Sequence, residues 1–234
     1  MTGKRWYDDA CGMALGLNLV GDRWALHVVR ELLLGPKRFA DLRGDLPGIS
    51  SNVLAQRLDE LEERVIVRRR RLPPPASAWV YELTEWGAEL EPVIVHLGRW
   101  AVRSPAFGRE SRLSCTSVVL SMRTMFRPEA AAGLDLRVGF RLEELQVLGR
   151  ITEGSLDVGP VDALAAPEHG GPAAVVTTTP EVLAGILYDG VALDEALESG
   201  AATLEGDRAA LVRYAECFWL PEPAAPTADD PAER

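Results

Sequence analysis

Residues 50–83, SSNVLAQRLDELEERVIVRRRRLPPPASAWVYEL, decide the fold that the sequence predicts. The first part is typical of a helix, because its apolar residues recur every three or four positions. That apolar stripe consists of Leu54, Leu58, Leu61 and Val65. Serine is a favoured residue at the start of a helix, so either Ser50 or Ser51 begins this one.

The second part of the stretch is typical of a two-stranded hairpin. Residues 65–72 are β-branched and basic, and residues 79–83 form a returning strand. Residues 73–77 hold three consecutive prolines, which predict a stiff turn between the strands. A basic hairpin therefore follows the helix directly.

Further helices are predicted on both sides of this stretch. Residues 24–34 have helical apolar spacing with Asp22 as a cap, and residues 39–46 form a second, short helix. After the hairpin, Thr84 begins a long helix in which Pro92 either causes a kink or marks the first turns. One face of that helix carries Leu90, Val93, Ile94, Leu97 and Ala101. Three helices followed by a hairpin are the order of a winged helix-turn-helix, which is a DNA-binding fold.

The helix that contains Leu54 presents polar side chains opposite its apolar stripe. Asn52 and Gln56 lie one turn apart there, and both residue types make bidentate hydrogen bonds to adenine in the major groove. Ser51 is placed to bind a phosphate at the positive end of the helix. Arg57 lies toward the core and is either a phosphate contact or an ion-pair partner. The alternative for Asn52 and Gln56 is that they are only solvated polar residues.

The hairpin supplies the positive charge that binding to DNA requires. Residues 68–71 are four consecutive arginines, and alternation along a strand turns about two of them toward DNA. The alternative is a solvated sheet edge that prevents aggregation. The predicted DNA contacts are Ser50, Ser51, Asn52, Gln56, Arg57, Arg38, Arg70, Arg71 and Ser77.

Charge divides the 234-residue chain into two parts. The net charge is −10, but residues 1–103 carry +1 and residues 104–234 carry −11. Such a difference suggests two modules with different partners. We expect a DNA-binding and dimerisation domain at 1–104, a linker at 105–112, a second domain at 113–220 and a disordered acidic tail at 221–234.

The second domain is predicted to be α+β. Its clearest strand is residues 134–142, in which apolar and polar residues alternate strictly. Further strands are predicted at 145–151, 173–178 and 202–205, and helices at 113–126, from Thr179-Pro180 onward, 193–198 and 207–219. Helices segregated from an antiparallel sheet would make this half of the chain α+β.

Several classes of function are not expected. The sequence has no nucleotide-binding glycine loop, no GxSxG motif and no HExxH motif, so we expect no enzyme and no catalytic residue. The three cysteines and three histidines are scattered, which predicts reduced thiols, no metal site and no cofactor. No stretch approaches the ~20 apolar residues that span a bilayer, so we expect a cytoplasmic protein with no membrane partner.

A series of short motifs runs through residues 8–103. They include Leu19-Val20-Gly21-Asp22-Arg23-Trp24, Arg30-Glu31-Leu32-Leu33, Gly35-Pro36, Arg38-Phe39, Leu46-Pro47-Gly48-Ile49-Ser50, Gln56-Arg57-Leu58, Tyr81-Glu82-Leu83-Thr84 and Leu90-Glu91-Pro92-Val93. In this order they resemble the start-to-end pattern of the HxlR-type regulators of the MarR group. The resemblance implies a homodimeric winged-helix repressor or activator that binds a double-stranded DNA operator, with dimer contacts from the first and last helices.

The chain departs from that family pattern at two positions. Val65 stands where the family commonly has glycine after the recognition helix, so the turn into the wing is expected to differ. Cys11-Gly12 stands where the family commonly has Cys-Pro. In some members this cysteine is a redox switch, a role that needs a lowered pKa and exposure. Cys11 is therefore either a redox sensor or a plain buried thiol.

The run from Thr177 to Phe218 has a second set of motifs. They are Thr179-Pro180, Leu183, Leu187, Gly190, Ala196-Leu197, Ser199-Gly200, Leu204, Gly206-Asp207 and Leu211. They resemble the C-terminal part of domains like sterol carrier protein 2 (SCP2). That resemblance implies an α+β domain with an apolar tunnel for a hydrophobic ligand.

A pocket in this domain would be lined by large apolar side chains. The predicted lining residues are Met122, Met125, Phe126, Phe140, Tyr188, Phe218 and Trp219, and the alternative is that they only fill the core. We expect a regulator that senses a hydrophobic small-molecule effector. One alternative is a carrier or catalytic domain that the winged helix recruits. Another is a ligand-free domain that only reinforces the dimer.

Overall fold

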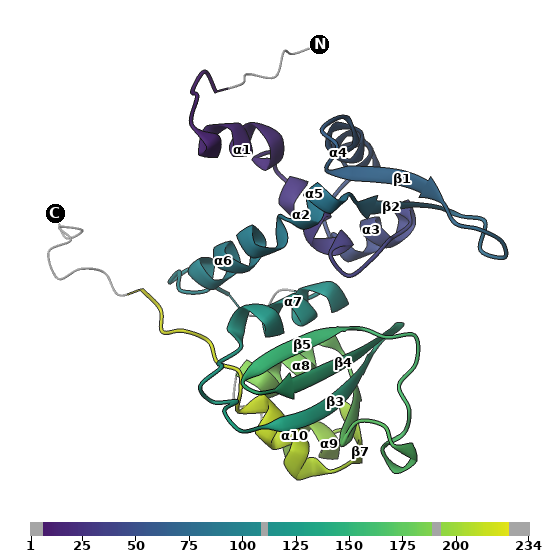
Figure 1. Cartoon of the computed structure of the whole chain (residues 1–234), viewed down its shortest axis with the longest axis vertical. Coiled ribbons are helices and arrows are strands. Elements are labelled where there is room, and N and C mark those ends of the chain that lie inside the picture. The colour runs from purple at the N-terminus through teal and green to yellow at the C-terminus, as the bar shows by residue number, and fades with distance from the viewer. Residues whose placement is uncertain (1–6, 109–111, 189–192, 225–234) are drawn as a thin grey trace, which may run out of the picture. The chain divides into compact units, whose positions relative to one another are not determined.

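The computed structural model describes residues 7–108, 112–188 and 193–224 (Figure 1). The chain forms two compact units, Met1–Ile94 and Val95–Arg234. The division falls inside one helix, ahead of the expected boundary at residue 104. Gly98 and Arg99 contribute to the second unit, since Gly98 approaches the Thr124 side chain and Arg99 Nη2 donates to the carbonyl of Phe126 at 3.4 Å. Each unit is described by itself.

The first unit has the predicted order of elements. Its helices are α1 (Gly12–Val20), α2 (Ala25–Leu32), α3 (Phe39–Asp45), α4 (Ser51–Glu63), α5 (Glu85–Ala88) and α6 (Glu91–Ala101). The wing consists of β1 (Val67–Arg71) and β2 (Trp79–Leu83), which pair antiparallel. The core contains Leu54, Leu58 and Leu61 of α4 together with Val28, Val29 and Leu32 of α2, Leu42 and Leu46. The winged helix-turn-helix order is confirmed.

The end of α4 corrects the prediction for Val65. This side chain is 63% exposed and lies outside the helix, so it is not part of the apolar stripe. The amide of Ile66 donates to the carbonyl of Leu61 at 2.9 Å and that of Val65 to Glu62 at 3.0 Å, which is the Schellman pattern. Such a turn needs a left-handed residue, and Val65 adopts φ 59°. The turn is therefore glycine-like although the residue is valine.

Two predicted helix caps also need correction. Asp22 does not cap α2 with its side chain, because Trp24 occupies that position and the Asp22 carboxylate lies 3.0 Å from Arg57 Nη1 instead. Thr84 caps only the short helix α5, where its hydroxyl accepts from the amide of Gly87 at 2.9 Å. The predicted long helix is thus two helices, and Pro92 stands in the first turn of α6. The break is local, since the amide of Leu90 still bonds the carbonyl of Gly87.

The second unit is a five-stranded sheet with helices. Its strands are β3 (Asp135–Leu142), β4 (Leu145–Thr152), β5 (Ser155–Pro160), β6 (Ala174–Thr178) and β7 (Ala202–Gly206), in the order β5-β4-β3-β6-β7. Its helices are α7 (Cys115–Met125), α8 (Pro180–Tyr188), α9 (Leu193–Glu198) and α10 (Arg208–Ala215), with a 3-10 turn at Pro167–His169. The predicted α+β class fits, but the sheet is mixed rather than antiparallel, because β3 and β6 pair parallel. Strand β5 was not predicted.

One face of this sheet is buried. The alternating residues Val138, Phe140 and Leu142 of β3 lie opposite Gly149, Val147 and Leu145 of β4 in antiparallel register. Helix α10 contacts β3 and β6 on this unit, and α7 contacts β5. The Phe140 ring lies 5.5 Å from that of Tyr214, and the Tyr214 ring 5.0 Å from that of Phe218. An aromatic cluster thus joins the sheet to α10.

The expected linker and tail lie partly outside the described residues. Residues 109–111 and 225–234 are not described, so most of the predicted disordered tail is not tested. Of the tail, residues 221–224 are described, and the amide of Ala224 donates to the carbonyl of Arg103 at 2.7 Å. Disorder of the tail stays a prediction. Among the described residues, no helix is long and apolar enough to cross a membrane.

Candidate nucleic-acid interface

The start of α4 gathers the predicted base-reading residues. The Ser50 hydroxyl accepts from the amide of Val53 at 3.3 Å, so Ser50, not Ser51, is the N-cap. Ser51 is half-exposed in the first turn, and Asn52 and Gln56 are exposed on the outer face. Gln56 Nε2 donates to Glu60 Oε1 at 3.1 Å. A helix N-terminus carries partial positive charge, so this end of α4 offers polar side chains and a favourable potential for a polyanion.

Arg57 belongs to an internal network of ion pairs. Its side chain is only 9% exposed, and its Nη1 atom contacts both Asp22 and Glu60. Arg64, one turn later in sequence than Glu60, donates to the carbonyl of Leu19 at 2.5 Å. These contacts tie α4 to the segment before α2. The structure therefore favours the ion-pair alternative for Arg57 over a phosphate contact.

The two strands of the wing place consecutive arginines on opposite faces. In the antiparallel register Arg69 lies opposite Tyr81 and Arg71 opposite Trp79. The guanidinium of Arg69 stacks 4.7 Å from the Trp79 ring centroid and 5.9 Å from that of Tyr81. Within the described part of the chain, neither Arg69 nor Arg71 has an acidic side chain within ion-pair distance. Their charge is available to a phosphate backbone.

The other face of the wing is half neutralised, because one carboxylate pairs with two arginines. Glu82 accepts from Arg68 Nε at 2.7 Å and from Arg70 Nε at 2.6 Å. Burial opposes ionisation of Glu82, but the hydrogen bonds and charges of Arg70 and Arg68 outweigh it and lower the pKa of that carboxyl. Arg70 and Arg71, both predicted as DNA contacts, thus differ. Arg70 has an acidic partner, whereas Arg71 has none among the described residues.

Arg69 is not among the predicted DNA contacts, although it lies on the same face of the wing as Arg71. Its backbone amide donates to Glu62 Oε1 of α4 at 3.2 Å, so this part of β1 adjoins α4. Burial raises the pKa of Tyr81, Arg69 lowers it, and Asp59 and Glu62 raise it further. These acids of α4 therefore lie near the Arg69 face of the wing. The sequence carries no signal for this difference between the two faces of the wing, because the cross-strand register decides which arginines lie beside Glu82.

The wing is anchored at its base by Lys37. Its backbone exchanges two hydrogen bonds with Tyr81, of 3.0 and 2.8 Å. The Lys37 ammonium lies 2.8 Å from Glu31 and 2.6 Å from Asp45. Glu31 is completely buried, so loss of the Lys37 charge would leave a buried carboxylate with less compensation and would destabilise the fold. The network fixes the wing relative to α2 and α3.

The remaining predicted contacts are exposed. Arg38 lies just before α3, where its amide donates to Asp41 Oδ2 at 3.1 Å, and its side chain is exposed. Ser77 lies in the turn of the wing with φ 39°. Cys11 is also exposed, at the start of α1, so the expectation of a buried thiol is wrong.

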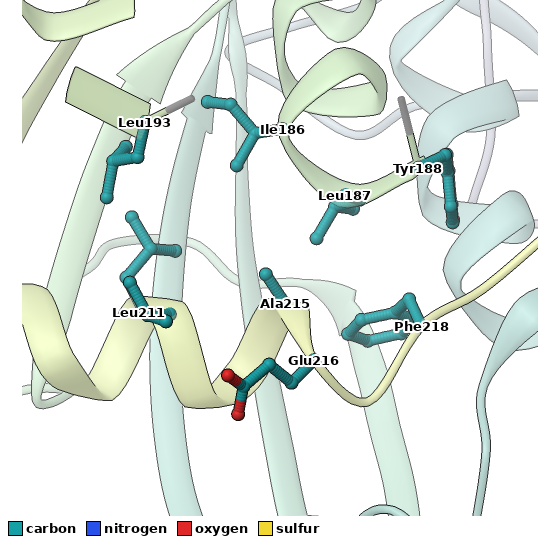
Figure 2. Close-up of a pocket in the computed structure, with 9 residues that line it drawn as sticks. Ile186, Leu187, Tyr188, Leu193, Leu211, Ala215, Glu216 and Phe218 are labelled. Carbon is teal, nitrogen blue, oxygen red and sulfur yellow. The ribbon is translucent and has the colours of Figure 1, made fainter. Parts of the chain in front are cut away.

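The second unit contains a mainly apolar pocket of about 340 Å³ (Figure 2). Ile186 and Leu187 of α8 face Leu211 and Ala215 of α10 across it. Of the seven predicted lining residues, Tyr188 and Phe218 line this pocket. Met122, Met125, Phe126 and Phe140 are buried in the core, and Trp219 is 41% exposed outside the lining. Their burial fits the alternative of core filling, and a role of these four residues in a ligand site stays a prediction.

The chain is similar to known proteins over its N-terminal part. Residues 19–105 match the family described as HxlR-like helix-turn-helix. The HTH-type transcriptional regulator YodB of Bacillus subtilis is 39% identical over 89 residues, which cover 38% of this chain and 80% of YodB. The regulator YvaP of the same organism is 33% identical over 93 residues, which cover 39% of this chain and 86% of YvaP.

Solved structures are similar to the same part of the chain at comparable sequence identity. The reduced form of YodB is 36% identical and covers 43% of this chain and 99% of that structure, with a TM-score of 0.38. The family assignment rests on sequence, namely on the match over residues 19–105 and on the 39% identity to YodB. The chain therefore belongs to the HxlR-like helix-turn-helix family of transcriptional regulators.

Proposed function

We propose that this protein regulates transcription by binding a DNA operator with α4 in the major groove and the wing on the adjacent backbone. Asn52 and Gln56 read base edges, and Ser50 and Ser51 bind phosphate at the N-terminal end of α4. The observation that carries the proposal is the pairing of the wing arginines. Glu82 pairs with Arg68 and Arg70 and offsets half of their charge, whereas Arg69 and Arg71 keep their full charge on the face that adjoins α4.

The proposed regulator is a homodimer. Helix α1 exposes Met13, Leu15 and Leu17, and α6 has no buried residue and exposes Val93, Leu97 and Trp100. Apolar surface of this extent is typical of protein contacts. A dimer presents two copies of α4 to half-sites about one helical turn apart. Leu97→Glu is expected to shift the protein toward monomer in sedimentation equilibrium, and an unchanged mass would contradict this interface.

The second unit is proposed to sense a hydrophobic small molecule, as an SCP2-like domain. The pocket between α8 and α10 falls within the size range of small-molecule sites, which is about 300–1,000 Å³. A ligand that prefers one conformation shifts the DNA-competent population, and the coupling is reciprocal. The proposed regulator acts in the cytoplasm, where its operator DNA lies.

The test begins with a random duplex pool, from which the full-length protein selects its preferred sequence. Affinity for that duplex is then measured while amphiphiles with one common ten-carbon chain are titrated. A sensor changes the affinity for DNA, and the duplex changes the affinity for the amphiphile by the same factor. Binding of the amphiphile with no change in DNA affinity would instead support a carrier domain.

Cys11 supports a second mode of regulation, by thiol oxidation. This thiol is exposed, and the amide of Cys11 donates to Asp9 Oδ1 at 2.9 Å. One similar structure is described as the redox regulator HypR in its oxidized form, at 29% identity and a TM-score of 0.39. Diamide treatment is expected to change the DNA affinity of the wild type but not that of Cys11→Ser. Equal responses of the two proteins would contradict this mode.

A further inference from the structure

The pocket in the second unit has a mostly apolar wall with few polar side chains. Most of the described lining side chains are aliphatic, and Phe218 and Tyr188 add two rings. Among the described lining residues, Glu216 is the one with a carboxylate side chain. The described lining contains no lysine, arginine or histidine. An anionic head group would find no positive side chain in this wall.

The hydroxyl of Tyr188 cannot donate a hydrogen bond to a ligand. Ser121 has a single hydroxyl proton, which it donates to the carbonyl of Val118 at 2.7 Å. The contact of 2.9 Å between Ser121 Oγ and Tyr188 Oη must therefore use the proton of Tyr188. Burial raises the pKa of Tyr188, so that proton stays bound. The two polar side chains of the described wall, Tyr188 and Glu216, are acceptors only.

Glu216 occupies a position where its charge is not compensated. It is the C-cap residue of α10, and the C-terminal end of a helix carries partial negative charge. Its carboxylate has no ion-pair partner among the described residues. Nearby arginines are engaged or lie outside the lining: Arg208 pairs with Asp194 at 2.7 Å, Arg127 lies 6.0 Å from the Trp219 ring centroid, and Arg213 is exposed. Glu216 is exposed, and Figure 2 shows it next to Ala215 at the end of α10, with its carboxylate turned away from Leu187 and Tyr188.

From this arrangement we infer that the pocket selects cationic amphiphiles, that is, an aliphatic chain with a protonated amine at one end. The chain lies between Leu187 and Leu211, and the ammonium donates to the Glu216 carboxylate and meets the negative end of α10. A fatty acid of the same length would place its carboxylate against these negative groups. The inference rests on the proposed ligand-binding role of the second unit and names the class of ligand.

The experiment compares three probes with one chain length, decylamine, decanoate and decanol, by calorimetric titration of the full-length protein. Exposed ion pairs are worth little, so decylamine is expected to bind about 5-fold more tightly than decanoate, with decanol in between. Glu216→Gln is expected to bring decylamine to within about 2-fold of decanol. Glu198→Gln, an exposed acid of α9 outside the lining, is the matched control and is expected to leave the order unchanged.

The outcomes separate this inference from the proposed sensor. Equal or tighter binding of decanoate, or an amine preference that survives Glu216→Gln, would overturn the charge selectivity although a ligand binds. If none of the probes binds, both the selectivity and the ligand-sensing role fail. Ala215→Phe, which fills the space between the helices, is expected to weaken all three probes together. An affinity for decylamine that Ala215→Phe leaves unchanged would place its binding elsewhere and overturn the inference.

Discussion

The guanidinium of Arg69 lies 4.7 Å from the ring centroid of Trp79, so an arginine of one wing strand rests on an exposed aromatic ring of the other. Stacking of this kind holds a guanidinium in place without neutralising it. Arg70, the next residue, is instead bonded to Glu82. The two arginines of the same strand are therefore expected to differ in what they contribute to DNA binding.

Arg69→Ala is expected to weaken binding to every duplex and to reduce the salt slope of the affinity by about 1, as the loss of one phosphate contact does. Arg70→Ala is the matched control, because it removes the same charge from a residue that is paired with Glu82. Its salt slope is expected to change less. Fluorescence anisotropy at several salt concentrations gives both slopes, and a larger change for Arg70→Ala would reverse the assignment of the two faces.

Val65→Gly is expected to stabilise the protein. Val65 adopts φ 59° while its side chain is 63% exposed, so glycine relieves backbone strain and loses little burial. The left-handed conformation of a residue with a Cβ atom costs about 1–2 kcal/mol of folding free energy. Glycine makes the unfolded chain more flexible, which offsets part of this gain, so the net stabilisation is expected to be about 0.5–1 kcal/mol. Urea unfolding measures this gain as a higher midpoint. Val65→Ala keeps the Cβ atom and serves as control; a lower midpoint for Val65→Gly would contradict the left-handed turn.

Gly149→Ala is expected to destabilise the second unit. A Cβ atom at Gly149 would overlap the Tyr214 hydroxyl and lie 2.8 Å from Cζ of the same ring. Overpacking of a core of this kind costs about 1–3 kcal/mol. Tyr214→Phe removes the hydroxyl, whose contact with Met122 Sδ is weak at 3.7 Å, and should recover part of the loss in a double-mutant cycle. Unchanged stability of Gly149→Ala would show that the ring is not seated there.

The ion pairs of Glu82 make the stability of the wing depend on pH. Because Arg70 and Arg68 lower the pKa of Glu82 in the folded state, the stabilisation is present above the pKa of the unfolded chain and is lost as pH falls through the folded value. Both arginines are partly exposed, so solvent screening limits the effect to about 1 kcal/mol or less. Urea unfolding of wild type and Glu82→Gln should converge at acidic pH, and parallel pH profiles would contradict this role.

The local spacing of apolar residues was sufficient to predict many of the helices and strands. The stripe of Leu54, Leu58 and Leu61 and the alternation through Val138 and Phe140 are patterns of burial, and burial is what the structure confirms for them. Val65 continued the stripe by spacing alone, yet the chain had already left the helix, because a turn depends on backbone conformation and not on hydrophobicity. Strand β5 was missed because Val158 is its one fully buried residue.

The location of the candidate site was predictable from the sequence. Which arginines of the wing pair with Glu82 was not. The position of Asn52 and Gln56 follows from the helical period. The difference between Arg69 and Arg70 does not, since it depends on the cross-strand register that sets Glu82 beside Arg68. The pocket lining was also not predictable from residue type, because Phe140 and Phe218 are equally apolar and only the packing separates core from pocket.

The most direct test of the account is the affinity of Asn52→Ala for the duplex that the wild type selects from a random pool. Loss of a bidentate contact to a base is expected to cost about 1–3 kcal/mol for that duplex and to relax the preference at one base pair of each half-site. Binding to unrelated duplexes should change little, because phosphate contacts remain. If Asn52→Ala keeps both the affinity and the base preference of the wild type, α4 does not read the operator through this residue and the account of base recognition is wrong.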